Sequence, residues 1–178
     1  MLNITIPEIE EWDEIKECFV HIKGQKIALE HSLVSLSKWE SQWCKPFLTS
    51  EKSETEMLDY IRCMTITQNV NPDIYTHIGY ENIHKIYEYI DAPMTATTIH
   101  DMNKGGSRRP ITSEIIYFWM ISYNIPFECQ KWHLTRLLTL IKVCELENRP
   151  PKKMSRADIM KQQASLNAAR RKKYNTRG

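Results

Sequence analysis

The sequence lacks any apolar run that could cross a membrane and has few residues of the types that keep a chain disordered. A membrane span needs about 20 consecutive apolar residues, and no stretch comes near that length. Five of the 178 residues are glycine and eight are proline, which excludes collagen-like and linker-like sequences. Residues 1–7 contain neither the basic nor the apolar region of a secretory signal. Because 42% of the residues are hydrophobic and 26% are charged, we expect a soluble globular protein inside a cell.

Closely spaced cysteine pairs are missing as well. The five cysteines, an odd number, lie far apart without a CxxC spacing, so neither a disulfide framework nor a zinc site is expected. Cys129 and His133 are spaced to share one helix face, but two ligands do not make a zinc site. We therefore interpret both as core residues and expect no metal ion and no other cofactor.

Familiar catalytic motifs do not occur. The sequence has no dinucleotide-binding, P-loop, HExxH or GxSxG pattern. The glycine- and arginine-containing segment 104–109 could approach a phosphate, but it lacks the Lys-Ser/Thr of a P-loop, so we interpret it as an exposed loop. Glu8, Glu10 and Glu11 beside Trp12 are interpreted as a solvated loop. We predict no catalytic residues and a protein that is not an enzyme.

Acidic residues are almost absent from the C-terminal end. Residues 150–178 hold nine Lys or Arg against one acid, a net charge of +8, whereas residues 1–149 hold 15 basic and 21 acidic side chains, a net charge of −6. This asymmetry indicates self-association or an anionic partner for the tail. An acidic protein surface, the protein's own body and plain solvation are favoured over a nucleic-acid backbone. The candidate partner contacts in the tail are Arg170, Arg171, Lys172 and Lys173.

The period-two alternation that is typical of strands occurs near the N-terminus. Apolar and polar residues alternate over residues 2–6. Residues 18–22 and 26–30 are rich in β-forming types and flank Lys23-Gly24-Gln25. Two such runs around a short glycine-containing segment predict a hairpin whose turn lies at those three residues.

Beyond the strands the apolar spacing becomes helical. Serine before an apolar run favours a helix start, with a full capping box at Ser53 and Glu56, and proline suits the first helical position. A further helix beginning at Ser155 has little apolar surface, so we expect it to project into solvent. The other predicted helices start near Ser32, Ser53 and Pro72 and cover residues 83–90, 111–123 and 127–147, the last being the longest.

These patterns predict a mainly α (α+β) fold. A helical body carries a small N-terminal β-hairpin element and a projecting basic C-terminal helix. We assign residues 1–149 to one globular domain, with the β-element at 1–31 and the helical body at 32–149. Residues 150–178 form the basic C-terminal helix or tail.

Four tryptophans lie on the predicted helices among apolar neighbours. Core packing is the simplest interpretation of such residues. Tryptophan also supplies large, rigid contact area and dominates the binding energy of many protein interfaces. The four are therefore also candidate partner contacts: Trp39, Trp43, Trp119 and Trp132.

Six sequence segments resemble those of a known protein family. They are LEHSLVSLSKWES at 29–41, DYIRCM at 59–64, MTAT at 94–97, PFECQKWHL at 126–134, PPKKM at 150–154 and LNAARR at 166–171. These stretches resemble small proteins of long-tailed bacteriophages (siphoviruses) of Gram-positive hosts, and the similarity runs from about Ile4 to Gly178. Such proteins look like tail assembly chaperones, encoded between the major tail protein and the tape measure protein.

The resemblance implies a non-enzymatic role in the host cell cytoplasm. A chaperone of this kind would coat the apolar stripes of the tape measure protein, help recruit tail tube subunits, and leave as the tube polymerises. It also implies that a ribosomal frameshift can give a longer minor form. No site residue transfers from the family. The alternatives are a permanent virion component, such as a tail-completion or head–tail joining protein, and a nucleic-acid-binding regulator.

Overall fold

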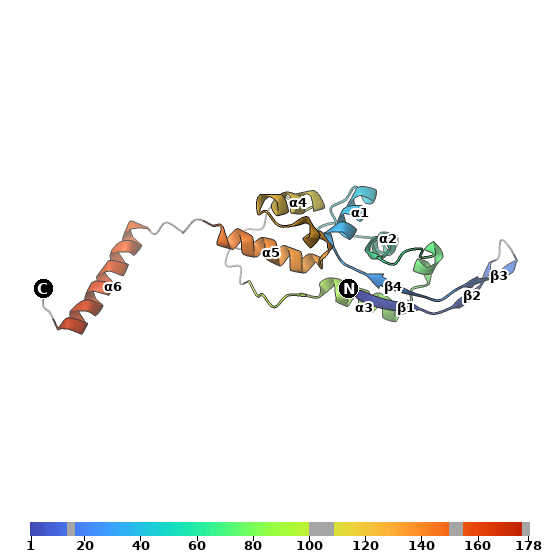
Figure 1. The fold of residues 1–178 in the computed structure, drawn as a ribbon, viewed down its shortest axis with the longest axis horizontal. Coiled ribbons are helices and arrows are strands. Elements are labelled where there is room, and N and C mark those ends of the chain that lie inside the picture. Colours follow the sequence, from blue (N-terminus) through green and yellow to red (C-terminus); the bar gives the residue numbers. More distant parts are fainter. Residues whose placement is uncertain (14–16, 100–108, 150–154, 176–178) are drawn as a thin grey trace. The chain divides into compact units, whose positions relative to one another are not determined.

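The computed structural model describes residues 1–13, 17–99, 109–149 and 155–175 (Figure 1). The chain separates into two compact units, residues 1–146 and 147–178. The fold is mainly helical with a small antiparallel β-element near the N-terminus, which confirms the predicted fold class. The strands are β1 (Leu2–Ile6), β2 (Ile9–Asp13), β3 (Cys18–Ile22) and β4 (Gln25–Leu29), and the helices are α1 (Leu33–Trp43), α2 (Glu54–Met64), η1 (Pro72–His77), α3 (Tyr80–Asp91), α4 (Ser113–Ser122), η2 (Phe127–Lys131), α5 (Leu134–Glu147) and α6 (Arg156–Tyr174), where η marks a 3₁₀ helix.

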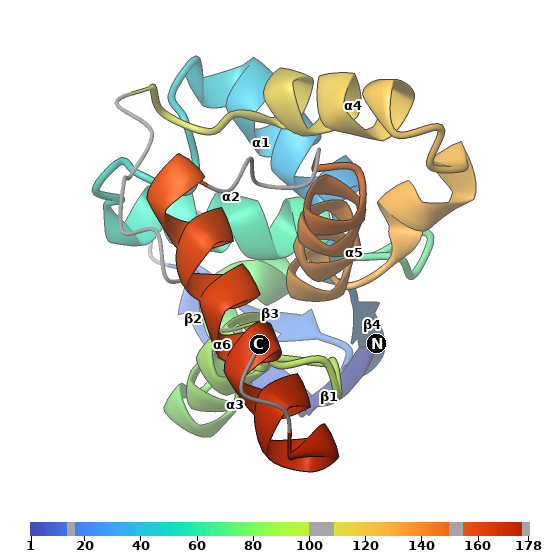
Figure 2. The same ribbon diagram turned by 90° about the vertical axis from the view of Figure 1, so that its left-hand side faces the viewer.

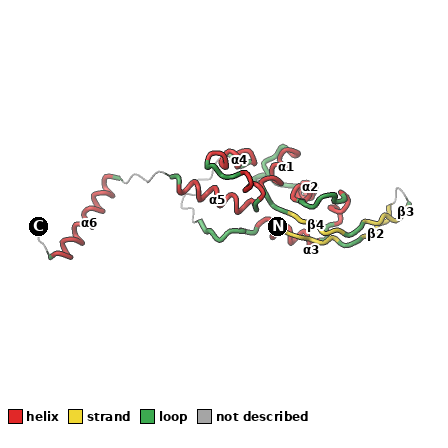
Figure 3. The backbone as a smooth tube through the Cα atoms, viewed as in Figure 1, coloured by secondary structure: helices red, strands yellow, loops and turns green. Residues whose placement is uncertain are grey.

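The four strands form one long hairpin. β1 pairs antiparallel with β4, and β2 pairs antiparallel with β3. Both ladders share one register, since Leu2 lies opposite Leu29 at the base and Asp13 lies opposite Cys18 near the tip. Figure 3 shows the paired strands, and in Figure 1 the β2–β3 end extends beyond the helices of this unit. Glu8, Glu10 and Glu11 were predicted to form a solvated loop. Glu10 and Glu11 instead belong to β2, paired with His21 and Val20, and Glu8 directly precedes that strand.

The predicted hairpin turn at residues 23–25 is wrong. These residues join β3 to β4 along one side of the hairpin, and the chain reverses between β2 and β3 instead. Pro7 lies across from Gly24 in this register, and proline has no N–H to donate to a ladder. A Cβ at Gly24 would lie 2.7 Å from the Glu8 nitrogen and 2.9 Å from the Ile6 carbonyl oxygen. The glycine therefore permits the close approach of two strands and does not mark a turn.

The base of the hairpin belongs to the core of the first unit. Alternate residues of β1 and β4 are buried, Ile4 and Leu29 among them, as the period-two pattern predicts. The other edge of β4 is also paired, because the Ile66 N–H donates to the Ala28 carbonyl at 2.8 Å. A lone two-stranded hairpin is only marginally stable, so this packing is what stabilises the element.

The starts of α1 and α2 confirm the capping predictions. The Ser32 hydroxyl accepts a hydrogen bond from the Ser35 N–H, and the Ser53 hydroxyl accepts one from the Glu56 N–H. In both caps the third residue bonds back to the backbone N–H of the capping serine. Cys44 caps the C-terminus of α1 with a left-handed φ of 52°. The helix therefore ends before the downstream proline.

The predicted single helix over residues 127–147 is wrong. The segment consists of η2, two extended residues and α5. His133 forms an isolated β-bridge with Ser32, and the Leu134 N–H donates to the His31 carbonyl at 2.7 Å. These tertiary bonds hold the backbone extended between η2 and α5, so Cys129 and His133 do not share a helix face. The longest described helix is α6, with 19 residues.

Helix α6 lies in the second unit and is exposed along its whole length. The Ser155 hydroxyl accepts a hydrogen bond from the Asp158 N–H and begins the helix, as predicted. None of its residues is buried, and its sequence offers few apolar side chains to bury. The prediction of an exposed basic C-terminal helix is confirmed.

Candidate protein-binding surfaces

Trp39 is a core residue and not a surface contact. Its side chain is fully buried, and its indole N–H donates to the Glu56 backbone carbonyl at 2.8 Å. The Phe47 ring packs edge-on against it, with ring centroids 5.1 Å apart. A partner cannot reach Trp39 in this conformation. The apolar spacing of α1 buries the ring, which agrees with its interpretation as a core residue.

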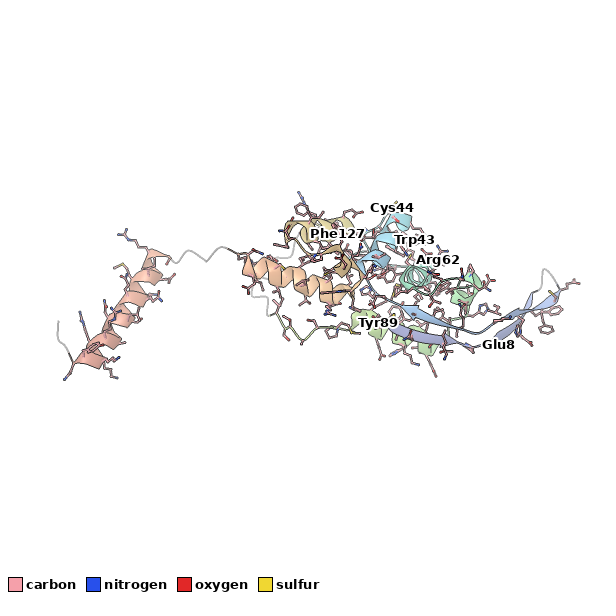
Figure 4. The ribbon with its side chains drawn as sticks, viewed as in Figure 1. Glu8, Trp43, Cys44, Arg62, Tyr89 and Phe127 are labelled. Carbon is pink, nitrogen blue, oxygen red and sulfur yellow. The ribbon has the colours of Figure 1, made fainter. Side chains whose placement is uncertain are left out.

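The other three predicted tryptophans are half-buried. The Trp43 indole N–H donates to the Asp59 carboxylate at 2.9 Å, and Figure 4 shows Trp43 on α1. The Arg136 guanidinium lies 4.3 Å from the centroid of the Trp132 ring. Trp119 belongs to α4. The structure packs Trp43 beside Trp39 but gives the three half-buried rings separate surroundings on α1, α4 and the segment before α5.

Helix α4 is apolar on its outer side as well as on its inner side. Ile116 and Met120 are fully buried. Phe118 and Ile121, on the opposite side, are 64% and 60% exposed. Figures 1 and 2 show α4 lying beside α1, which covers one side of it. A helix that is apolar all round is normally covered all round. The described part of the chain leaves this side uncovered.

The exposed apolar residues of α4 continue into η2. Tyr117 and Ile121 are one turn apart and share a face, and Phe118 and Ile121 are neighbours in the same way. The half-exposed Phe127, labelled in Figure 4, lies with its ring centroid 6.4 Å from that of Tyr117. We call this surface the α4 patch; it consists of Tyr117, Phe118, Ile121 and Phe127.

A buried carboxylate holds α4 in place. The N-cap residue of α4, Thr112, makes no side-chain capping hydrogen bond. Instead Glu40 of α1 accepts a hydrogen bond from the Ser113 N–H at 2.7 Å with one oxygen and from the Phe47 N–H at 2.8 Å with the other. Glu40 is itself buried. The α4 patch is therefore built on a helix whose first turn is bonded to the core.

The four basic candidates of the tail lie in the last turns of α6. All are exposed, and three of them fall in the last turn, where the helix macrodipole favours cations. Consecutive positions point in different directions around a helix, so these four charges do not form a single flat patch. The residues are Arg170, Arg171, Lys172 and Lys173.

An exposed aromatic pair near the tip of the hairpin was missed by the sequence analysis. Trp12 of β2 lies directly opposite Phe19 of β3, with ring centroids 5.0 Å apart and an edge-to-face angle of 70°. Their side chains are 50% and 70% exposed. The pair could be found from the sequence only with the correct strand register, which the misplaced turn had excluded.

Two buried histidines, one directly before α1 and one directly before α5, bond to residues of α2 and α3. The His31 ring nitrogen Nδ1 lies 2.5 Å from the Tyr60 hydroxyl, and the His133 Nε2–H donates to the Tyr89 carbonyl at 2.9 Å. Burial, with a smaller contribution from His133, lowers the pKa of His31 to about 3. His31 is therefore neutral near pH 7 and acts as a structural bridge between α1, α2 and, through the adjacent His133 ring, α5.

The described residues form no metal-binding cluster and no membrane-spanning helix. Among the described residues, no three His, Cys, Asp or Glu side chains gather in a way that could hold a metal ion. No helix in the described ranges is long and apolar enough to cross a membrane. A cleft of about 540 Å³ reaches His31 and is lined by Lys52 and Asp91 besides apolar side chains such as Phe47 and Leu138. The His31 ring in this cleft is bonded to the Tyr60 hydroxyl.

Comparison with known proteins gives no relative: no family model, no curated protein and no solved structure matches the chain.

Proposed function

We propose that the protein is a non-enzymatic assembly chaperone that covers apolar stripes of a long helical client with its α4 patch. The observation that carries this proposal is the uncovered apolar side of a helix that is otherwise anchored in the core. Exposed, contiguous apolar surface of this kind is typical of protein-binding sites. The aromatic rings of the patch supply rigid contact area at low entropic cost.

The resemblance of the sequence to siphovirus proteins supports a specific client. It suggests the tape measure protein, with the major tail protein as the tube subunit that later replaces the chaperone in the host cell cytoplasm. A groove or patch that binds an amphipathic helix contacts apolar residues spaced by three and four positions along that helix. Phe118 and Ile121 offer that spacing on the chaperone side. A patch of four side chains suits a contact that must be released when the tube forms.

The test is co-expression of the tape measure protein with the parent chain or with the double variant Phe118→Ser, Ile121→Ser. We expect the parent to keep the client soluble and to co-purify with it, and the variant to bind at least about tenfold more weakly, because aromatic anchors dominate such interfaces. The matched control is Tyr80→Ser, Tyr87→Ser, which removes two exposed aromatic rings from α3. It should bind like the parent.

Two results would overturn the proposal. The first is unchanged client binding by the α4 variant. The second is the presence of the protein at a fixed stoichiometry in mass spectra of purified phage particles. That second result would favour a permanent virion component, because a chaperone leaves before the particle is complete.

A further inference from the structure

We propose that the acidic hairpin end of one copy binds the basic helix α6 of a second copy of this chain. This self-association is independent of client binding by the α4 patch. Two exposed surfaces carry the inference, and neither is used by the proposed chaperone function. We define the arm face as the exposed side of the hairpin end that carries Glu8, Glu10, Trp12, Phe19 and His21.

The arm face combines an aromatic pair with a carboxylate pair. Along β2, alternate residues point to the same side, so Glu10 and Trp12 share a face, and their cross-strand partners are His21 and Phe19. Nδ1 of His21 lies 3.4 Å from a Glu10 carboxylate oxygen, and Nε2 contacts the Glu8 carboxylate. One imidazole thus serves two carboxylates. The register also places Lys23 across from Glu8, so the face carries two carboxylates and one ammonium beside its exposed rings.

Helix α6 presents the complementary chemistry along one side. Ile159 and Leu166 are two turns apart and share a face, and both are exposed. Arg170 lies one turn beyond Leu166 on that face, and Lys173 lies nearly one turn further. The side of the helix therefore reads as two aliphatic residues followed by two cations.

The charges of the two segments have opposite signs. Residues 8–23 hold six acids and two lysines, a net charge of −4, whereas α6 holds six Lys or Arg and one acid, a net charge of +5. The aliphatic part of α6 fits the aromatic pair, and its cations fit the carboxylates of Glu8 and Glu10. A guanidinium or ammonium over an indole ring would add a cation–π contact at Trp12.

The proposed contact also explains how α6 gains stability. A helix with no buried residue is marginal by itself, because most helical stability in proteins comes from packing one face. Each copy carries one arm face and one α6. Two copies that exchange α6 reciprocally close as a dimer, whereas one-way exchange gives a ring or a longer chain.

The first experiment is sedimentation velocity of the full chain over a wide concentration range at low and high salt. We expect concentration-dependent association that weakens as salt rises, because the charge pairs are solvent-exposed. The double variant Trp12→Ser, Phe19→Ser should weaken association at least about tenfold. The matched control, Tyr80→Ser with Tyr87→Ser, should associate like the parent.

A charge exchange makes the contact specific. Glu8→Lys with Glu10→Lys and, separately, Arg170→Glu with Lys173→Glu should each weaken association. All four changes in one chain should restore it, because opposite charges again face each other, which misfolding cannot produce.

A parent that stays monomeric at every concentration, or an unaffected Trp12→Ser, Phe19→Ser variant, would overturn the proposal. So would a charge exchange without restoration. Client binding by the arm variants should match the parent, so failure here is distinct from failure of the chaperone proposal.

Discussion

Helices α4 and α6 are exposed for opposite reasons. Helix α4 has more apolar surface than the core can cover, so Ile116 and Met120 are buried while Phe118 and Ile121 face outward. Helix α6 has few large apolar side chains for its length, and none of its residues is buried. The first is bonded to the core through Glu40, and the second is begun by its own Ser155 cap.

The difference shows that anchoring and partner chemistry are separate properties of a helix. The buried half of α4 fixes its place, and its exposed half would suit an apolar partner. The exposed surface of α6 is basic and would suit an acidic partner. The two surfaces can therefore bind different molecules without competing, as the two proposals require.

The largest expected effect comes from removing the carboxylate that anchors α4. Glu40→Ala should lower the free energy of unfolding by about 3 kcal/mol, because it leaves the buried N–H groups of Ser113 and Phe47 without an acceptor. Urea unfolding monitored by tryptophan fluorescence measures the change. Glu40→Gln, which keeps an acceptor, should lose less, and Glu88→Ala on the exposed side of α3 should lose little. Equal losses for Glu40→Ala and Glu88→Ala would show that α4 is held by packing alone.

A second, smaller effect is the pH dependence of the stability of the first unit, which contains His31. Unfolded histidine takes up a proton below about pH 6.5, whereas the pKa of folded His31 is about 3, so the neutral ring favours the folded state. Its contribution is complete above pH 6.5 and is lost as the pH falls toward 3. At pH 5 the loss should be about 2 kcal/mol.

The pH effect is measured by urea unfolding at neutral pH and at pH 5. His31→Gln should show a smaller difference between the two conditions than the parent. His84→Gln, which changes an exposed histidine of α3, is the matched control and should behave like the parent. An unchanged pH dependence in His31→Gln would assign the acid sensitivity to other groups.

The smallest expected effect comes from removing α6 altogether. Truncation after Pro151 should change the free energy of unfolding by no more than about 0.5 kcal/mol, because α6 has no buried residues to lose. Thermal unfolding of the full and shortened chains checks this. The shortened chain should also lose self-association. A large fall in the melting temperature would mean that α6 docks on its own first unit.

The sequence by itself determined the features that depend on residues a few positions apart. The caps at Ser32, Ser53 and Ser155 were predicted correctly because a serine hydroxyl bonds to a backbone N–H three residues later. The exposed nature of α6 followed from its composition.

Only the tertiary structure decided the features that depend on contacts between distant segments. The strand register placed Trp12 opposite Phe19. It also placed Gly24 where two strands approach closely, and the residue types around Gly24 are the same as those of a turn. The bridge from Ser32 to His133 divided the predicted long helix. Which apolar residues of α4 stay exposed depends on how much of that helix the core covers. At each of these places, hydrogen bonds and packing between distant segments overrode the conformation that the local sequence favours. The local pattern does not specify which side chains are buried, whereas the tertiary contacts do.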